Sequence, residues 1–231
     1  AHHPYSFFLA PAVSVSDPNF VPLSDLSRLE RALDAVFGAY GVNRRLSLYL
    51  TEYGYETNPP NPFRGVAPRA QSLYLDEAGY MAWRDPRVRA LAQFLLYDSA
   101  PDTRFPPGSQ RYWSTFQTGL RYQNGVAKPS LGSYRLPLYL PDPVVSRGRP
   151  TLVWAMLRPA PHGSSQQARV QWQPSSGGAF RTLSTVTTDN PNGVLTARLQ
   201  LPGAGVVRVA WTSPSGRLVY SRRVGVRARG A

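Results

Sequence analysis

The sequence predicts an α/β region followed by an all-β region, and three observations lead to this fold class. Over roughly the first 140 residues, segments with helical periodicity alternate with short apolar runs, which is typical of a parallel sheet covered by helices. From Thr151 onward, short β-type runs follow one another with turn residues between them, which indicates a β-sandwich. The composition also changes near residue 145, beyond which Asp189 is the only acidic residue.

The first region carries helical patterns in three places. Residues 25–40 repeat apolar side chains at three-to-four spacing, and Ser24 is placed to act as the N-cap. Pro68 opens a second helix that extends to about Arg84, with an expected inner face of Leu73, Ala78, Met81 and Ala82. A short third helix is expected after Lys128-Pro129.

Two apolar runs between these helices are expected to form strands. In residues 46–50, leucines alternate with Ser47 and Tyr49, and this run leads directly into Thr51-Glu52-Tyr53-Gly54-Tyr55. The second run, Leu91–Tyr97, ends in Asp98 and a long loop. Polar residues at the carboxyl end of a strand lie where α/β barrels hold their catalytic groups. The segment around Glu52 is therefore the first candidate for a functional site.

The second region contains six short runs of β type, separated by clusters of Gly, Pro, Asn and Ser. The expected strands are Thr151–Leu157, Arg169–Gln173, Phe180–Thr187, Val194–Leu201, Val206–Thr212 and Leu218–Arg227. Residues 141–150 form the expected linker, which leaves domains at 1–140 and 151–231. Trp154, Trp172 and Trp211 lie on these strands, where core packing and contact with a glycan are both open.

The composition restricts the classes of partner. The formal charge is +13, and every basic residue except Lys128 is an arginine. Because the arginines are spread along the sequence, we interpret them as a solvated surface and expect no nucleic-acid partner, while an acidic polysaccharide stays open. No run is long and apolar enough for a membrane span, and no cysteine is present. No residues have metal-ligand spacing and no Gly-rich loop follows a strand, so no cofactor is expected.

Several motifs in order resemble the last three βα units of a clan A glycoside hydrolase, a TIM-barrel family. His3-Pro4-Tyr5 resembles the end of the sixth strand, Leu48 to Gly54 the seventh strand with its nucleophile, and Ala92 to Asp98 the eighth. The closing stretch is similar to the family's ending through Trp113, Gly119-Leu120, Asn124-Gly125, Lys128-Pro129 and Tyr134. The resemblance implies a partial (β/α)8 barrel, strands 6–8 with their helices, before an immunoglobulin-like or fibronectin-like β-sandwich.

The resemblance also implies a reaction and roles for particular residues. Retaining glycosidases use two carboxyl groups about 5–5.5 Å apart, one as nucleophile and one as acid and then base. Glu52 matches the nucleophile, while Glu56 lies farther along in the loop and is less rigidly placed. Tyr5 would donate its hydroxyl to Glu52, and His3 would line the sugar site. The remaining substrate-contact candidates are Trp113, which is equally suited to be a buried loop anchor, Tyr55 and Asp98.

The family's acid/base glutamate, expected after an Asn at the fourth strand, has no counterpart in this sequence. We therefore expect the chain to be a C-terminal fragment of a retaining glycoside hydrolase that acts on a poly- or oligosaccharide and is inactive by itself. The alternative is a non-catalytic carbohydrate-binding or cell-surface protein with a vestigial barrel. Either function is typical of an extracellular or cell-surface bacterial protein.

Overall fold

The computed structural model describes residues 1–146 and 148–228, and the chain divides into two compact units. The first unit is Ala1–Leu131 and the second begins at Gly132. Helix α3, Pro129–Arg135, spans this division. None of the helices in the described part of the chain combines the length and apolarity that crossing a bilayer requires.

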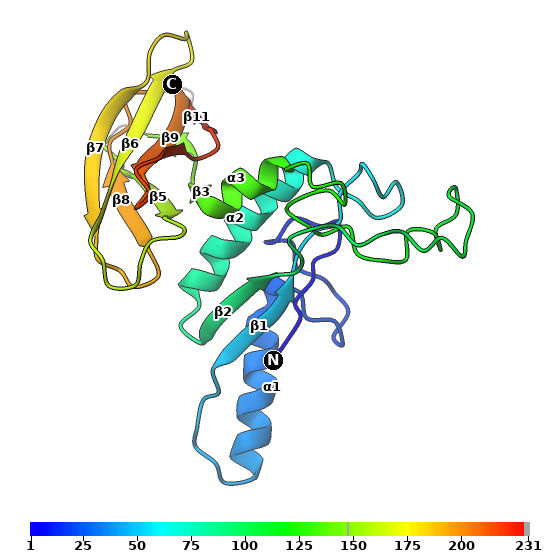
Figure 1. Ribbon diagram of the computed structural model, residues 1–231. Coiled ribbons are helices and arrows are strands. Elements are labelled where there is room, and N and C mark those ends of the chain that lie inside the picture. The colour runs from blue at the N-terminus through cyan, green and yellow to red at the C-terminus, as the bar shows by residue number, and fades with distance from the viewer. Residues whose placement is uncertain (147, 229–231) are drawn as a thin grey trace. The chain divides into compact units, whose positions relative to one another are not determined.

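The first unit is built around two parallel strands and two longer helices (Figure 1). Its elements are the 3-10 helix η1 (Leu23–Asp25), α1 (Leu26–Ala39), β1 (Leu48–Tyr53), α2 (Pro68–Arg84) and β2 (Val88–Gln93). Strand β1 pairs with β2 so that Leu48 faces Val88 and Tyr53 faces Gln93. Leu48, Leu50 and Tyr53 are buried on β1, whereas Tyr49 and Thr51 are exposed.

The fold class expected from the sequence is wrong. Strands make up 30% of the structure and helices 18%, so the protein is mostly β, with a curled sheet, and not a partial (β/α)8 barrel. The first unit pairs two strands where the expectation required three. His3-Pro4-Tyr5 forms no strand, since Pro4 has no amide hydrogen and the Tyr5 amide donates to the His3 carbonyl in a tight turn. Only His2 bridges to Leu50.

The second strand of the first unit also ends earlier than the apolar run Leu91–Tyr97 indicated. Strand β2 stops at Gln93, and Leu95 has a φ of 72°, in the left-handed region. A leucine in that region breaks the extended geometry that a ladder requires. Leu96 and Tyr97 beyond it are about half exposed, at 52% and 50%.

Helices α1 and α2 lie where their periodicity predicted, but their surroundings differ from the expectation. Ser24 is not the N-cap of α1, because its hydroxyl donates to the carbonyl of Val13. On α1 only Leu26 is buried, while Val36 and Tyr40 are exposed. On α2 the buried face centres on Leu75 and Ala78 and includes Gln71 and Asp76, whereas Leu73 is 40% exposed.

Gln71 of α2 joins three segments of the first unit. Its amide nitrogen lies 2.8 Å from the carbonyl of Tyr55 and 3.3 Å from those of Thr118 and Gly119. Its amide oxygen accepts a hydrogen bond of 2.6 Å from the Ser130 hydroxyl. Because buried carbonyls need hydrogen-bond donors, this side chain fixes the chain after β1 and the approach to α3.

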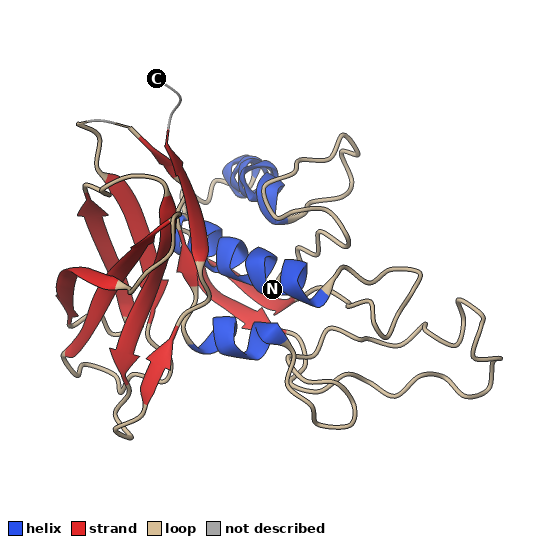
Figure 2. Cartoon of the chain, turned by 90° about the horizontal axis from the view of Figure 1, so that it is seen from above, coloured by secondary structure: helices blue, strands red, loops and turns tan. Residues whose placement is uncertain are grey.

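The second unit consists of two sheets. Its strands are β3 (Leu138–Tyr139), β4 (Val144–Val145), β5 (Thr151–Met156), β6 (Gln166–Pro174), β7 (Arg181–Thr188), β8 (Val194–Leu199), β9 (Gly205–Thr212), β10 (Leu218–Tyr220) and β11 (Val224–Ala228). One sheet has the order β4-β11-β9-β6-β7 with β10 also on β9, and the other has the order β3-β5-β8. Figure 2 draws the strands in red and the helices in blue.

Both sheets contribute side chains to one hydrophobic core, as in a β-sandwich. Val153 and Leu195 enter it from one sheet, and Val170, Val207 and Trp211 enter it from the other. Trp154 and Trp172 are also buried, at 0% and 7% exposure, so packing accounts for all three strand tryptophans. The expected strand Leu218–Arg227 is divided into β10 and β11, and residues 138–139, placed before the linker by composition, pair with β5.

We predict that Gln71→Ala destabilises the first unit by about 3 kcal/mol, since it leaves buried carbonyls and the Ser130 hydroxyl without their partner, at about 1–3 kcal/mol per group. Urea denaturation measures the change. Leu73→Ala on the same helix is the control, and its effect should stay within about 0.5 kcal/mol because Leu73 is exposed. Equal losses in the two variants would contradict the role assigned to Gln71.

Candidate functional site

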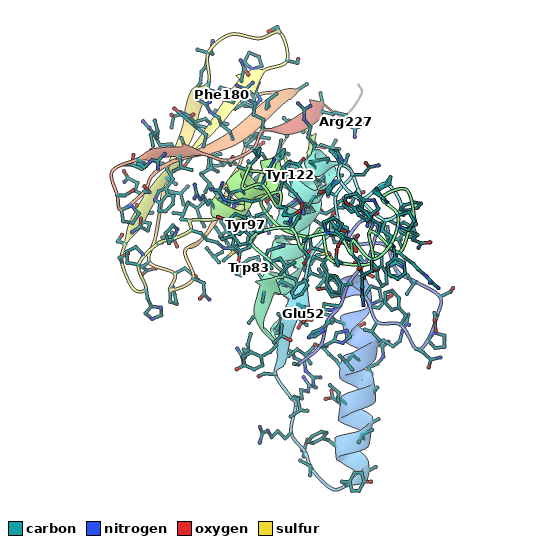
Figure 3. The ribbon with its side chains drawn as sticks, turned by 45° about the vertical axis from the view of Figure 1, so that its right-hand side comes forward. Glu52, Trp83, Tyr97, Tyr122, Phe180 and Arg227 are labelled. Atoms are coloured by element: carbon teal, nitrogen blue, oxygen red, sulfur yellow. The ribbon has the colours of Figure 1, made fainter. Side chains whose placement is uncertain are left out.

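Glu52 lies near the carboxyl end of β1, between Leu50 and Tyr53, which both pair with β2 (Figure 3). Leu48 and Leu50 alternate into the core, and the register shifts between Leu50 and Tyr53, so that Tyr53 is buried as well. Glu52, between them, is half-buried, with 33% of its side chain exposed. A carboxylate on a paired strand has less freedom than one in a loop, because the backbone on which it is mounted is fixed. The structure thus gives Glu52 the rigid position expected from the sequence.

Two residues from the start of the chain hold one oxygen of Glu52. The Tyr5 hydroxyl donates to Oε2 across 3.2 Å, and Nδ1 of His3 lies 3.4 Å from the same oxygen. His3 is oriented from its other side, since its Nε2 is 3.0 Å from Oγ1 of Thr51. The bridge between His2 and Leu50 brings these residues beside β1. The expected grouping of His3, Tyr5 and Glu52 is therefore present.

The two oxygens of Glu52 have different surroundings. Burial and then the negative charge of Glu52 raise the pKa of the Tyr5 hydroxyl well above its usual range. The hydroxyl therefore stays protonated and donates a hydrogen bond to Oε2. No described residue donates a hydrogen bond to Oε1. One oxygen is thus oriented by the protein, and the other is available to a ligand.

Glu56, the nearest competitor, is held in a different way. Its Oε2 accepts a hydrogen bond from Nδ2 of Asn61, which also donates to Oε1 of Gln117 at 3.3 Å. Burial raises the pKa of this carboxyl group. Oδ1 of Asn61 accepts from the amide of Phe63, so the same amide side chain closes the loop. Glu56 is an anchor of the loop after β1 in this arrangement.

Tyr55 does not line a site. Its side chain is 1% exposed, and its hydroxyl lies 2.9 Å from both the Tyr53 hydroxyl and the carbonyl of Leu9. The ring packs edge-on against Tyr53 and tilted against Tyr74. This corrects the expectation that Tyr55 contacts substrate, because a tyrosine with both ring and hydroxyl satisfied inside the core cannot reach a ligand.

Asp98 and Trp113 line a second candidate site in the first unit. The pocket encloses about 440 Å3, and the residues around it are Pro59, Pro60, Asp98, Ser99, Pro101, Tyr112, Trp113, Tyr122, Gln123 and Asn124. Trp113 stands edge-on to Tyr112 at a centroid distance of 5.0 Å. Aromatic rings with a few polar groups are typical of a small-ligand site. His3, Tyr5 and Glu52 are not among the residues that line it.

A buried ion pair supports this pocket. Nζ of Lys128 donates to Oδ1 of Asp98 across 2.7 Å and to the carbonyl of Gln117 across 3.0 Å. The amide of Gly119 also donates to Oδ1, whereas Oδ2 is buried and has no partner among the described residues. Burial raises the pKa of Asp98 and lowers that of Lys128. Asp98 is thus a buried anchor of the segment that leads to the pocket.

The close approach around this pair requires glycine at position 119. A Cβ added to Gly119 would lie 2.5 Å from the amide nitrogen of Asp98 and 2.5 Å from the carbonyl carbon of Tyr97. Sequence reasoning missed Lys128 as part of a site. The available signal was its isolation, since it is the one lysine in a chain whose other basic residues are all arginine.

We predict that Asp98→Asn destabilises the protein by about 3–5 kcal/mol, because it leaves Lys128 as an uncompensated buried charge. The double variant Asp98→Asn with Lys128→Met should recover most of the loss, as both charges are then removed. Chemical denaturation measures both effects. The exposed Asp142→Asn is the matched control, with an expected change within about 0.5 kcal/mol. A double variant no more stable than the single one would refute the pairing argument.

Comparison with known proteins assigns no family to this chain. No protein-family model matches it, and no curated protein does. Among solved structures, a superoxide reductase (neelaredoxin) from Ignicoccus hospitalis aligns with a TM-score of 0.32 and 16% identity, covering 41% of this chain and 80% of that one. A superoxide reductase from Archaeoglobus fulgidus gives 0.31 and 8%, covering 40% and 86%. Likenesses this low carry no argument about chemistry. The described residues hold no cluster of three or more His, Asp or Glu side chains fit for a metal ion.

Proposed function

We propose that Glu52 is the nucleophile of a retaining glycoside hydrolase that acts on O-glycosidic bonds of a poly- or oligosaccharide. The observation that carries the proposal is the unequal treatment of the two carboxylate oxygens. Tyr5 and His3 both hold Oε2, while Oε1 has no partner among the described residues. A nucleophile needs one oxygen fixed and the other free to attack, and the paired strand supplies the rigid mounting.

The reaction assigns a simple role to each group. Oε1 forms a bond to the anomeric carbon, the bond from that carbon to the leaving oxygen breaks, and a second carboxyl group protonates the leaving oxygen. The same second group then removes a proton from water, which releases the sugar and regenerates the Glu52 carboxylate. This second group would belong to a residue outside the 231-residue sequence, since Glu56 is engaged by Asn61. A polysaccharide substrate would fit an extracellular or cell-surface protein.

We predict that Glu52 is labelled by 2-deoxy-2-fluoro glycosides that carry a dinitrophenolate leaving group. Such a leaving group departs without protonation, so the nucleophile can act without its partner carboxyl group, and the fluorine slows release of the adduct. A panel of hexosyl and pentosyl reagents is needed. Peptide mass spectrometry should locate the adduct on the peptide that contains Glu52.

Two variants make this test specific. Glu52→Gln should abolish labelling. Tyr5→Phe should slow it about ten- to a hundredfold without moving the site, because the loss of one hydrogen bond to a charged group is worth about 1.5–3 kcal/mol. Adducts on Glu56, or labelling that survives in Glu52→Gln, would refute the assignment of the nucleophile.

A second candidate function is non-catalytic carbohydrate binding, which the pocket beside Asp98 favours. Tyr112, Trp113 and Tyr122 supply aromatic surface there, while Gln123 and Asn124 supply polar groups. Sugar rings present C–H faces that suit aromatic side chains and hydroxyl groups that suit polar ones. This function needs no second carboxyl group.

We predict that Trp113→Ala weakens the binding of oligosaccharides about tenfold in titration calorimetry, since it removes the largest aromatic surface of the pocket. Trp83→Ala is the matched control, because Trp83 is 43% exposed on α2 and lies outside the pocket. Unchanged binding in Trp113→Ala would remove the support for this pocket. Binding without labelling of Glu52 would favour the non-catalytic function.

A further inference from the structure

The positive charge of the chain is concentrated in the second unit. Residues 132–231 contain 13 arginines, no lysine and two aspartates, which gives +11 of the formal +13 of the chain. Asp142 and Asp189, the two acidic residues, both lie outside the strands of the larger sheet. Because the arginines are spread along the chain, the charge asymmetry between the two units comes from the scarcity of acidic residues in the second one.

One arginine on the outer face of the larger sheet, Arg208, lies against two aromatic side chains. The Arg208 guanidinium lies 3.8 Å from the ring centroid of Phe180 and 4.1 Å from that of Tyr220. Arg208 is on β9, where Val207 and Val209 point into the core, so its own side chain points outward. Figure 3 labels Phe180 beside this sheet. Two ring contacts restrict the guanidinium more than solvent would.

The hydrogen bonds of Arg208 leave much of its donor capacity available. Its Nε donates to Oε1 of Gln171, the residue opposite it on β6, across 2.9 Å. Its two terminal nitrogens donate to no described residue, and it forms no ion pair with a described carboxylate. Two further arginines, Arg169 on β6 and Arg223 beyond β10, are exposed, and Arg223 lies 5.3 Å from the Phe180 ring. The unused donors therefore belong to a fixed, planar cation.

The class of anion follows from these contacts. A guanidinium fork matches a carboxylate through two parallel hydrogen bonds. Single-stranded nucleic acids depend on aromatic rings for base stacking, and Arg208 and Arg223 already lie against the Phe180 ring. Several arginines on one sheet face suit an extended chain with repeated negative groups.

We propose that the outer face of β6, β9 and β10 binds a carboxylate-bearing polysaccharide, with Arg208 as the principal contact to a uronate group. That the ligand is a glycan rests on the proposed function, whereas its negative charge is inferred from the arginines on this face. Arg208 receives the carboxylate in its terminal nitrogens, and Arg169 and Arg223 engage neighbouring units of the polymer. The sandwich unit would hold an acidic glycan independently of Glu52.

The test is titration of the full chain with polygalacturonate, a neutral glucan and duplex DNA at low and physiological salt. Polygalacturonate should bind, more weakly at higher salt because exposed charges are screened, and the neutral glucan should not bind at this face. Arg208→Gln should weaken polygalacturonate binding about tenfold, and Arg208→Lys several-fold, since lysine keeps the charge but loses the fork. Thermal unfolding verifies that each variant is folded.

Two controls separate the possible outcomes. Arg198→Gln removes the same charge from β8 in the other sheet, and it should change the affinity less than about twofold. If binding depended only on net charge, Arg198→Gln and Arg208→Gln would weaken it equally. Labelling of Glu52 by the 2-deoxy-2-fluoro glycosides should be unchanged in Arg208→Gln, so failure of the hydrolase assignment is distinguishable from failure of this one. No binding of polygalacturonate, equal losses in Arg198→Gln, or tighter binding of duplex DNA would each overturn the proposal.

Discussion

The amide of Gln71 is the constraint on which the arrangement of the first unit depends. It is a buried polar group on a helix, and three backbone carbonyls from two distant segments converge on its nitrogen. Unpaired carbonyls in a dry interior are costly, so the segments after β1 and before α3 can pack here only if this donor is present. The position of Tyr55 then fixes the end of the strand that carries Glu52.

The two units use charge in opposite ways. In the first unit the important charges are few and individually held, as with Asp98 and Lys128 inside the core and Glu52 beneath Tyr5. In the second unit the core is apolar and the arginines lie outside it, where Arg208 is stabilised by ring faces instead of by an opposite charge. A held carboxylate suits a chemical step, and arginines on one face of a sheet suit the retention of an anionic polymer.

Local patterns in the sequence predicted individual elements better than their assembly. Pro68 and the periodicity after it predicted α2 from end to end, and the β runs from Thr151 onward matched strands, since turn residues mark their ends. The prediction of a partial barrel was wrong because motifs similar to those of the family, around Tyr5 and in Leu91–Tyr97, do not determine the backbone geometry. The left-handed φ of Leu95 and the turn at Pro4 end the extended runs, and neither has a signal in hydrophobic spacing.

The candidate sites show the same division. Strand-end position made Glu52 a candidate, and the resemblance to a glycoside hydrolase implied that Tyr5 and His3 lie beside it, as the structure places them. Burial could not be read in the same way, because Tyr55 alternates along the chain like a surface residue but lies in the core. The pair of Asp98 and Lys128 is 30 residues apart in sequence, and only tertiary packing brings it together. The scarcity of acidic residues beyond residue 145 was visible in the sequence, and the division between Leu131 and Gly132 assigns the resulting positive charge to one unit.

The burial of Lys128 also gives the first unit a chemical reporter of its own motion. It is the one lysine side chain in the sequence, and its exposed fraction is 2%. Amine-directed acylating reagents therefore find no surface lysine, and they reach this ε-amino group only when the surrounding packing opens. The rate of its acylation would follow the local opening equilibrium, in the way that amide hydrogen exchange does. The acylation of Lys128 thus measures how often the packing around Asp98 opens.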